Sequence, residues 1–367
     1  MLRKMAGIAG LAVILFGVAG TGHGQGQAIA AEADVARKSA TDQDQVYFIE
    51  EKGKYGFING RGEIVLEPVN DSLVYDTQAA GSVYYVEDRG AKKQTYFDLT
   101  GKKLFECAFR ACGIPYDGLA LYMEKVKTAD GTAATRYGYI DMQGKIVVQP
   151  IYHKAFNFSE GLARVNQGKA SGYIDTKGKL VIPYRFSQTS DFSEGMAAVS
   201  LTVGGKYGYI DTSGKLVIPP RFDYATPFSD GAAVVSVNGK YGYIDKTGKY
   251  IQKPQFTMAQ PFSEGLAFVE RNGATFYINK KGEKVIQNIT AGGLFSGGLA
   301  PASRGHTYGY INKSGTFVIK DRFEWGNSFK GDLAEVYLPS SESPGYVRGF
   351  IDRSGTIVWP LDYKIGQ

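Results

Sequence analysis

The sequence holds few of the residues on which metal, redox and nucleic-acid chemistry depend. Its 367 residues include only 2 Cys and 3 His. Two Cys exclude a disulfide-dense scaffold, and three His argue against a multi-histidine metal site. The net charge is +6 without any block of Lys or Arg, whereas a nucleic-acid-binding protein concentrates its cations on one face. We therefore expect no nucleic-acid partner, no metal and no other cofactor.

Glycine and aromatic residues are abundant instead. The chain holds 48 Gly, 25 Tyr and 21 Phe, and 43% of its residues are hydrophobic, which is enough to bury a core. No stretch after residue 45 shows the helix period, whereas Gly-rich turns between short aromatic runs are typical of strands. This composition predicts an all-β chain.

The first thirty residues have the pattern of a secretory signal peptide. Arg3 and Lys4 precede an uncharged apolar stretch from 5 to 20, and Ala28 and Ala30 offer small residues for cleavage near Ala30. An uncleaved anchor is the alternative, but the stretch is shorter than the ~20 apolar residues that span a bilayer. We expect a secreted or cell-envelope protein with no membrane span after cleavage. Residues 31–45 would be a flexible lead.

A motif of the form Gly-Tyr-Ile-Asp recurs along the rest of the chain. Its first position falls at residues 56, 95, 138, 172, 208, 242, 276, 309 and 349, at spacings of 33 to 43 residues. A recurrence of this length indicates a repeat architecture. We place the array at 46–362, with an irregular insertion at 99–136.

Each repeat contains three segments that read as strands. In one copy these are 207–211, 215–218 and 232–237, separated by a turn at Gly214 and by Pro219 and Pro220. Asn238 and Gly239 then predict a tight hairpin into the next copy, so the strands should pair antiparallel across repeat boundaries. We expect about nine three-stranded units of ~34 residues in an open solenoid-like stack, because one unit buries too little to fold alone. A closed β-propeller is the second choice, because its blades usually have four strands and most units here show only three.

Two sequence motifs in each unit resemble the WG-repeat family of bacterial proteins. They are Gly-Tyr-Ile-Asp-Thr-Ser-Gly-Lys-Leu-Val-Ile-Pro at 208–219 and Phe-Ser-Glu-Gly-Leu-Ala-Phe-Val at 262–269. The Trp that usually precedes the first Gly is Tyr in most copies, and Trp325 and Trp359 are the only tryptophans. The resemblance implies an exported all-β repeat array with no established common activity.

Carboxylates recur at two places in each unit. They are Asp141, Asp175, Asp211 and Asp245 in the first motif, and Glu160, Glu194, Asp230 and Glu264 in the second. An Asp ahead of a turn Gly caps the turn backbone, so we interpret the set as structural. A calcium loop would need alternating Asp ligands, which the turns lack. His153 and His306 are too isolated for a metal site or a catalytic triad, and we expect no catalytic residue.

The aromatic residues of the first motif are the best candidates for ligand binding. Tyr139, Tyr173, Tyr209 and Tyr243 would form a column along the array, either as core between the units or as an exposed platform for a sugar or peptide. Arg185, Arg221 and Arg322 each precede a Phe in the following loop, where they could join that platform or only lie over the loop.

Cys107 and Cys112 lie in the irregular segment. A small-loop disulfide is plausible in an exported protein, with buried free thiols or redox chemistry as the alternatives.

These features favour a non-enzymatic binding or scaffold protein, a monomer that presents an extended surface to a cell-envelope protein or glycan. The first alternative is an enzyme whose site lies in 99–136 or 336–348, to be tested by replacing Asp117, Glu124, Asp130 and the adjoining Glu335 one at a time. The second is a structural spacer without a ligand.

Overall fold

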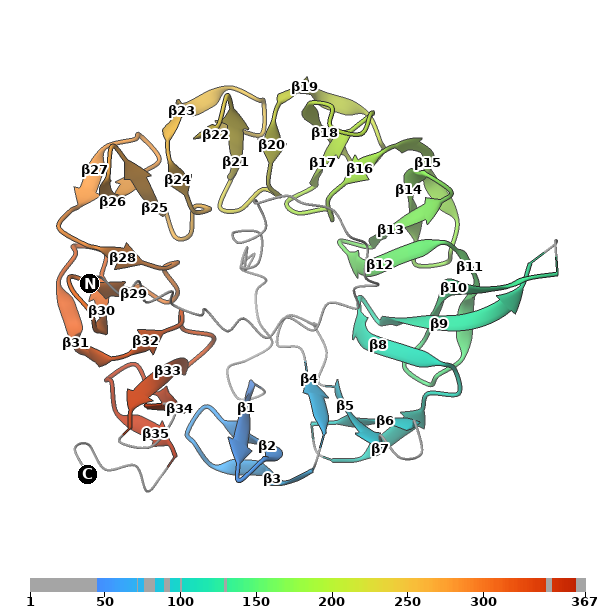
Figure 1. Cartoon of the computed structure of the whole chain (residues 1–367), viewed down its shortest axis with the longest axis horizontal. Helices are drawn as coiled ribbons and strands as arrows, with labels where there is room; N and C mark the ends of the chain where they lie inside the picture. The colour runs from blue at the N-terminus through green and yellow to red at the C-terminus, as the bar shows by residue number, and fades with distance from the viewer. Residues whose placement is uncertain are drawn as a thin grey trace, which may run out of the picture. The chain divides into compact units, whose positions relative to one another are not determined.

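The computed structural model describes residues 45–70, 72–75, 83–88, 93–99, 101–128, 131–340 and 345–360. The predicted signal peptide and nearly all of the predicted lead lie outside these residues. Contacts divide the chain into residues 1–32 and 33–367, and all the described residues belong to the second unit. Its described strands form nine antiparallel sheets, of which eight have four strands and the first has three. We call them blades 1 to 9 in chain order (Figure 1).

The strands are, blade by blade, β1 (Val46–Glu51), β2 (Lys54–Asn59) and β3 (Ile64–Asn70); β4 (Leu73–Tyr75), β5 (Val83–Asp88), β6 (Lys93–Asp98) and β7 (Lys103–Glu106); β8 (Ala111–Tyr116), β9 (Leu119–Lys127), β10 (Ala133–Ile140) and β11 (Ile146–Tyr152); β12 (Lys154–Ser159), β13 (Leu162–Gln167), β14 (Ala170–Asp175) and β15 (Leu180–Phe186); β16 (Gln188–Thr189), β17 (Met196–Ser200), β18 (Tyr207–Asp211) and β19 (Leu216–Phe222); β20 (Tyr224–Ala225), β21 (Ala232–Val237), β22 (Lys240–Asp245) and β23 (Tyr250–Phe256); β24 (Met258–Ala259), β25 (Leu266–Arg271), β26 (Ala274–Asn279) and β27 (Lys284–Ile286); β28 (Ala291–Gly292), β29 (Leu299–Ser303), β30 (Tyr308–Asn312) and β31 (Phe317–Phe323); and β32 (Trp325–Gly326), β33 (Ala334–Pro339), β34 (Tyr346–Ile351) and β35 (Ile357–Trp359).

Blade 6 shows how the sequence makes a blade. β21 and β22 pair antiparallel across the hairpin at Asn238 and Gly239, which both have positive φ, as the two-residue turn predicts. The Asp245 carboxylate then caps the turn into the outer strand β23 by accepting the backbone N–H groups of Thr247 and Lys249. The predicted meander across repeat boundaries is therefore confirmed. One blade consists of the second half of one repeat and the first half of the next.

The expectation of three-stranded units was wrong. The missing fourth strand is the innermost one, and in blade 6 it is only the two-residue β20, paired with β21. Such a short strand carries no period-two pattern, so the sequence analysis read it as loop. The outer strand was also underestimated, because β19 continues through Pro219 and Pro220 to Phe222. An edge strand tolerates proline, since one side of its backbone needs no partner.

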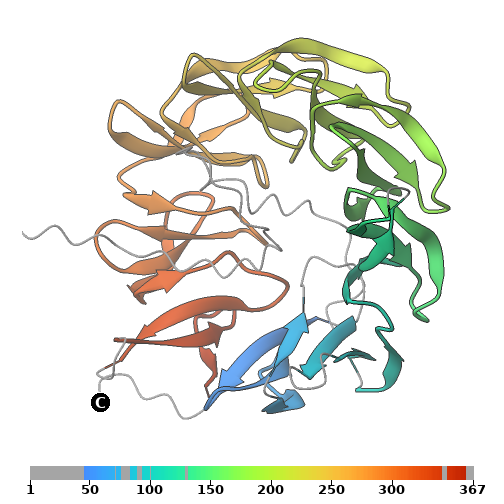
Figure 2. The ribbon, with the colours of Figure 1, turned by 45° about the vertical axis from the view of Figure 1, so that its right-hand side comes forward.

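The expectation of an open solenoid was wrong as well, because the first and last blades pack together. The Tyr47 hydroxyl of β1 donates to the Lys330 carbonyl at 2.5 Å and accepts the backbone N–H groups of Asp332 and Leu333 at 3.0 and 3.2 Å. The ring of Tyr47 packs edge-on against Phe350 of β34, at 5.7 Å between centroids. Figures 1 and 2 show blade 1 beside blade 9. The nine blades therefore form a closed β-propeller.

We expect Tyr47→Phe to weaken this closure. The variant keeps the ring but removes one hydroxyl that serves three backbone groups, which should cost about 2 kcal/mol of unfolding free energy. Chemical denaturation measures the loss, and amide hydrogen exchange should become faster in β1–β3 and β32–β35 than elsewhere. Equal acceleration in all blades would contradict a closing role for Tyr47.

A bulge on the outer strand explains the glycine of the first motif. In blade 5, Tyr207 pairs with Phe222 and Tyr209 pairs with Ile218, so Gly208 alone faces the residues from Pro219 to Arg221. A Cβ atom on Gly208 would lie 2.3 Å from the Ile218 carbonyl oxygen. The same close approach, at 2.3 to 2.5 Å, recurs at Gly56, Gly138, Gly172, Gly242 and Gly309.

The segment 99–136 keeps the blade pattern. Its extra length goes into the hairpin of β9 and β10, which reaches beyond the ring in Figure 1. Cys107 follows β7 of blade 2, Cys112 lies in β8 of blade 3, and the structure joins them in a disulfide with 6.0 Å between Cα atoms. The bond thus ties neighbouring blades. Over the described ranges there is no helix that could cross a membrane.

Candidate functional site

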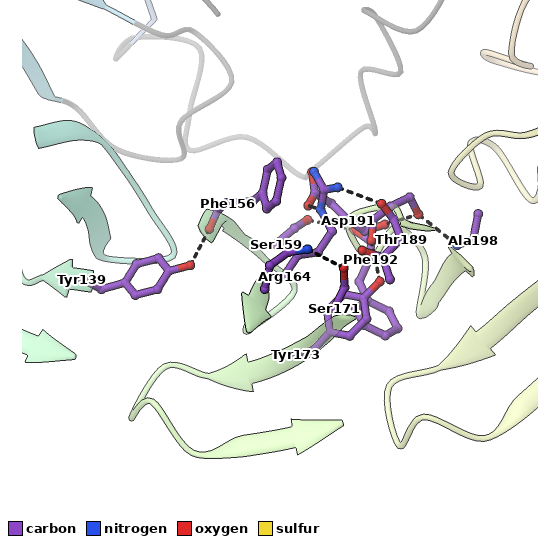
Figure 3. Close-up of polar contacts among 12 residues, drawn as sticks. Tyr139, Phe156, Ser159, Arg164, Ser171, Tyr173, Thr189, Asp191, Phe192 and Ala198 are labelled. Carbon is purple, nitrogen blue, oxygen red and sulfur yellow. Dashed lines mark hydrogen bonds and ion pairs between the residues drawn. The ribbon is translucent and has the colours of Figure 1, made fainter. Parts of the chain in front are cut away.

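The four tyrosines predicted as ligand contacts are part of the core. Tyr139, Tyr173, Tyr209 and Tyr243 are all fully buried. Each hydroxyl donates to a backbone carbonyl near the inner strand of the next blade, as Tyr209 does to Thr226 at 2.7 Å. Figure 3 shows the same bond from Tyr139 to Phe156, also at 2.7 Å. The tyrosines therefore hold adjacent blades together, so the expected alternative of a core between units is confirmed and the alternative of an exposed platform is wrong.

The hydrogen bonds of this column can be tested against a matched control. Tyr209→Phe leaves the part-buried Thr226 carbonyl without this donor, so we expect a loss of about 1 kcal/mol of unfolding free energy. Tyr122 is also buried, but its hydroxyl has no partner among the described residues. Tyr122→Phe should therefore be neutral or slightly stabilising in the same denaturation experiment. Equal losses in both variants would show that the bond to Thr226 contributes nothing.

The three predicted arginines also connect blades. Arg185 and Arg221 each lie over the ring of the following Phe and donate to the carbonyl of a turn glycine in the next blade, Gly214 and Gly248 respectively. Arg322 does the same over Phe323, with a bond of 2.5 Å to Gly355. Their guanidinium groups are therefore bound to the protein itself, and they do not gather with the tyrosines into one site.

The recurring acids of the second motif form hydrogen bonds between successive blades. The Glu160 carboxylate accepts the N–H groups of Glu194 and Gly195 in the next blade, at 2.7 and 2.9 Å. Glu194 in turn accepts the Gly231 N–H and pairs with Lys246 at 3.1 Å. These acids have φ between 51 and 54°, where a residue with a side chain is strained. The hydrogen bonds to the next blade offset this strain, which explains why an acid and not glycine occupies the position.

An additional ion pair lies between blades 4 and 5. Arg164 of β13 donates to the Asp191 carboxylate at 2.6 Å and to the Thr189 carbonyl at 2.7 Å, as Figure 3 shows. Its guanidinium lies 3.7 Å from the centroid of Phe156. The second-strand position of Arg164 holds Ala198 in blade 5 and Val234 in blade 6, so this contact is not part of the repeat. Arg164 is already bound by Asp191, Thr189 and Phe156, so we interpret this contact as one that holds blades 4 and 5 together.

Two exposed and two half-buried aromatic residues gather at blades 8 and 9 instead. Trp325 of the inner strand β32 is 49% exposed and lies 4.7 Å, between centroids, from Tyr308 of the preceding blade. It pairs across the sheet with Tyr337, whose ring is 5.0 Å from that of Tyr346, which is 43% exposed. The Trp325 indole N–H donates to the Asn327 side chain at 3.1 Å, which orients the ring. We call these four residues the aromatic cluster.

This cluster is not among the predicted ligand contacts, although the sequence holds one signal for it. Trp325 is one of only two tryptophans. Its position at the start of the inner strand holds Gln188 in blade 5 and Met258 in blade 7. A position that varies between copies of a repeat is free of the structural role that the invariant positions serve. Comparing the copies column by column would have pointed to Trp325.

Comparisons with known proteins agree with the repeat and add little on function. A model of the WG containing repeat matches residues 137–169, 172–207, 207–241, 241–273 and 308–338, so these repeats are found across the chain. No curated protein sequence matches this chain.

The chain also resembles solved structures, at low identity. They include dihydro-heme d1 dehydrogenase NirN in complex with DHE, with 13% identity, a TM-score of 0.44, and coverage of 88% of this chain and 74% of that chain. Apo AztD from Citrobacter koseri has 8% identity and a TM-score of 0.40, over 85% of this chain and 92% of that chain. Hsv2 from Kluyvelomyces marxianus has 11% identity and a TM-score of 0.36, over 63% and 93%. At these values the likenesses carry no conclusion about activity.

Proposed function

We propose that the protein is a non-enzymatic binding propeller of the cell envelope or the secreted space. It acts as a monomer and presents an extended surface, centred on the aromatic cluster, to a protein or glycan ligand. The observation that carries this proposal is the exposure of Trp325 and Tyr346, when the tyrosines of the repeat motif are buried. Trp and Tyr dominate the energetics of binding surfaces because they bury much area at little cost in conformational entropy. Export rests on the predicted signal peptide, which N-terminal sequencing of the secreted protein tests.

An enzyme with its site in 99–136 or 336–348 is less well supported. Of the acids that it would use, Asp117 accepts the Gly161 N–H at 2.9 Å, and Glu335 is bound by two nitrogens of Arg348 at 2.7 and 3.2 Å. Asp130 lies outside the described residues. A general acid or base needs a carboxyl group free to reach a substrate proton, and these two carboxylates already serve the protein.

The test of the binding function compares variants of the aromatic cluster. We expect the secreted protein to bind defined glycans on an array, or a purified envelope protein, with at least a tenfold loss in Trp325→Ala and in Tyr346→Ala. Val203→Ser is the matched control, because Val203 is 89% exposed on the β17–β18 hairpin, away from the cluster. Circular dichroism checks that all variants fold. Binding unchanged in both cluster variants, or a hydrolytic turnover abolished by one acid variant, would overturn the proposal.

A further inference from the structure

Blade 7 departs from the repeat at a position beside an open pocket. In blade 7 the glycine of the first motif is replaced by Phe276, which pairs with Val269 as Gly242 pairs with Val235 in blade 6. The Cβ of Phe276 is tolerated because β27 ends at Ile286, before the bulge that crowds the glycine in other blades. The segment that replaces the bulge and its arginine is Gln287-Asn288-Ile289.

The cavity holds about 420 Å³ and lies between blades 7 and 8. Its walls are the β26 residues up to Phe276, the β27 residue Lys284, the loop from Gln287 to Thr290, and Arg304 from the next blade. Two cationic residues and two amide residues thus line one space, and none of the described residues that line it carries a carboxylate. The acids nearest in sequence, Glu270 and Glu283, are bound by Thr257 and Asn279.

The two cations have no acidic partner. Within the described ranges neither Lys284 nor Arg304 forms an ion pair, and their contacts are with rings and one backbone carbonyl. The Lys284 ammonium lies 4.1 Å from the Phe276 centroid, and Arg304 lies over Phe317 and donates to the Gly315 carbonyl at 3.4 Å. Both side chains are exposed at this open pocket, so an oxyanion bound there can accept charge-assisted hydrogen bonds from each of them.

Blade 2 supplies a contrast at the same register position. Lys103 of β7 pairs across the sheet with Phe97 as Lys284 pairs with Ile278. The Lys103 ammonium, however, is neutralised by Glu106 at 2.5 Å. In blades 4, 5 and 8 the position holds Leu180, Leu216 and Phe317. A lysine without a counter-ion is thus specific to the blade with the cavity.

We propose that this cavity binds a small molecule that carries an oxyanion, such as a phosphorylated or carboxylated sugar. Lys284 and Arg304 hold the anionic group, and Gln287 and Asn288 contact polar groups on the rest of the ligand. The volume exceeds what a bare phosphate or carboxylate ion fills, which is why a ligand with a body is expected. The site uses other residues than the aromatic cluster, although Arg304 and Tyr308 belong to the same hairpin of β29 and β30, and it extends the binding function to a second ligand.

The experiment is calorimetric titration of the full chain with glucose 6-phosphate, glucuronate and glucose. We expect saturable binding of at least one anionic sugar and none of glucose, and the preferred anion distinguishes phosphate from carboxylate. The double variant Lys284→Met, Arg304→Gln should bind at least tenfold more weakly, whereas Lys103→Met should bind as the parent does. Thermal unfolding checks the fold of each variant.

Three outcomes would overturn the proposal: no saturable binding of either anionic sugar up to about 10 mM, binding of glucose equal to that of the anionic sugars, or binding that the double variant leaves intact. Each of these can occur whether or not Trp325 contributes to binding elsewhere, so the result does not depend on the proposed function.

Discussion

Gly208→Ala should lower the free energy of unfolding by about 3 kcal/mol, although it adds a single methyl group. The added Cβ would lie 2.3 Å from the Ile218 carbonyl oxygen and 2.8 Å from the Pro220 nitrogen, both in the backbone of β19. Backbone atoms cannot turn aside as a flexible side chain can, so the bulge itself must move. That movement would also shift Arg221 away from the Gly248 carbonyl of the next blade.

Gly113→Ala is the matched control. Gly113 is also a strand glycine, in β8, but its nearest neighbour would be the Leu121 carbonyl oxygen at 3.6 Å, an ordinary contact. Urea denaturation should therefore show a change within about 0.5 kcal/mol for this variant. If Gly208→Ala were equally silent, the close approach of the two strands would not be what requires glycine in the motif.

Much of the fold could be predicted because its local signals repeat. Asp245 before a turn and Asn238-Gly239 between two strands specify hairpins by backbone conformation alone, and those hairpins are present. In blades 5 to 9 the fourth strand could not be predicted, since two residues, such as Tyr224 and Ala225 in blade 6, are too few to show a pattern. Ring closure could not be predicted either. It depends on small angles between blades that add up over the array and on Tyr47, which contacts residues more than 280 positions away.

The candidate sites were harder to predict than the fold, because a repeated residue has two explanations. Tyr209 recurs in the motif because its hydroxyl binds the next blade, although phenylalanine takes this position in blades 1 and 9. Glu194 recurs because its carboxylate also binds the next blade. From the sequence, the acids are expected to be structural, whereas the tyrosines could be either core or an exposed platform. The better guide is departure from the repeat, at Trp325 in blade 9 and at Phe276 with Lys284 in blade 7. These residues differ from their counterparts in other blades. Trp325 is exposed, and Phe276 and Lys284 line the pocket.

The buried tyrosines predict cooperative unfolding in alkali. Burial raises the pKa of Tyr47, Tyr122 and Tyr152 to about 12, and burial raises the pKa of Tyr209 and Tyr243 still further. A phenol whose pKa is higher in the folded state than in the unfolded state keeps its proton longer when folded. Its contribution to stability is complete below pH 10, the unfolded value, and is lost as the pH rises from 10 towards the folded pKa.

The loss is large because the tyrosine recurs in most blades. At one pH unit above the unfolded pKa, each such tyrosine destabilises the fold by about 1.4 kcal/mol, and seven of them by about 10 kcal/mol, which is comparable to the whole stability of a typical domain. The seven are Tyr96, Tyr139, Tyr173, Tyr209, Tyr243, Tyr277 and Tyr310, all at most 1% exposed. We therefore expect the propeller to unfold in one steep step near pH 11, with tyrosinate absorbance and loss of the β-sheet dichroism coinciding.

Tyr122→Phe is the control for this step as well, because it removes one raised pKa without removing a hydrogen bond made among the described residues. Its unfolding midpoint should move to higher pH, since one fewer phenol releases a proton on unfolding. The opposite result would be gradual tyrosinate formation around pH 10 while the dichroism persists. That result would mean that the phenols of the column reach solvent in the folded state, and the interfaces between blades would have to be looser than the bonds to Thr226 and Phe156 imply.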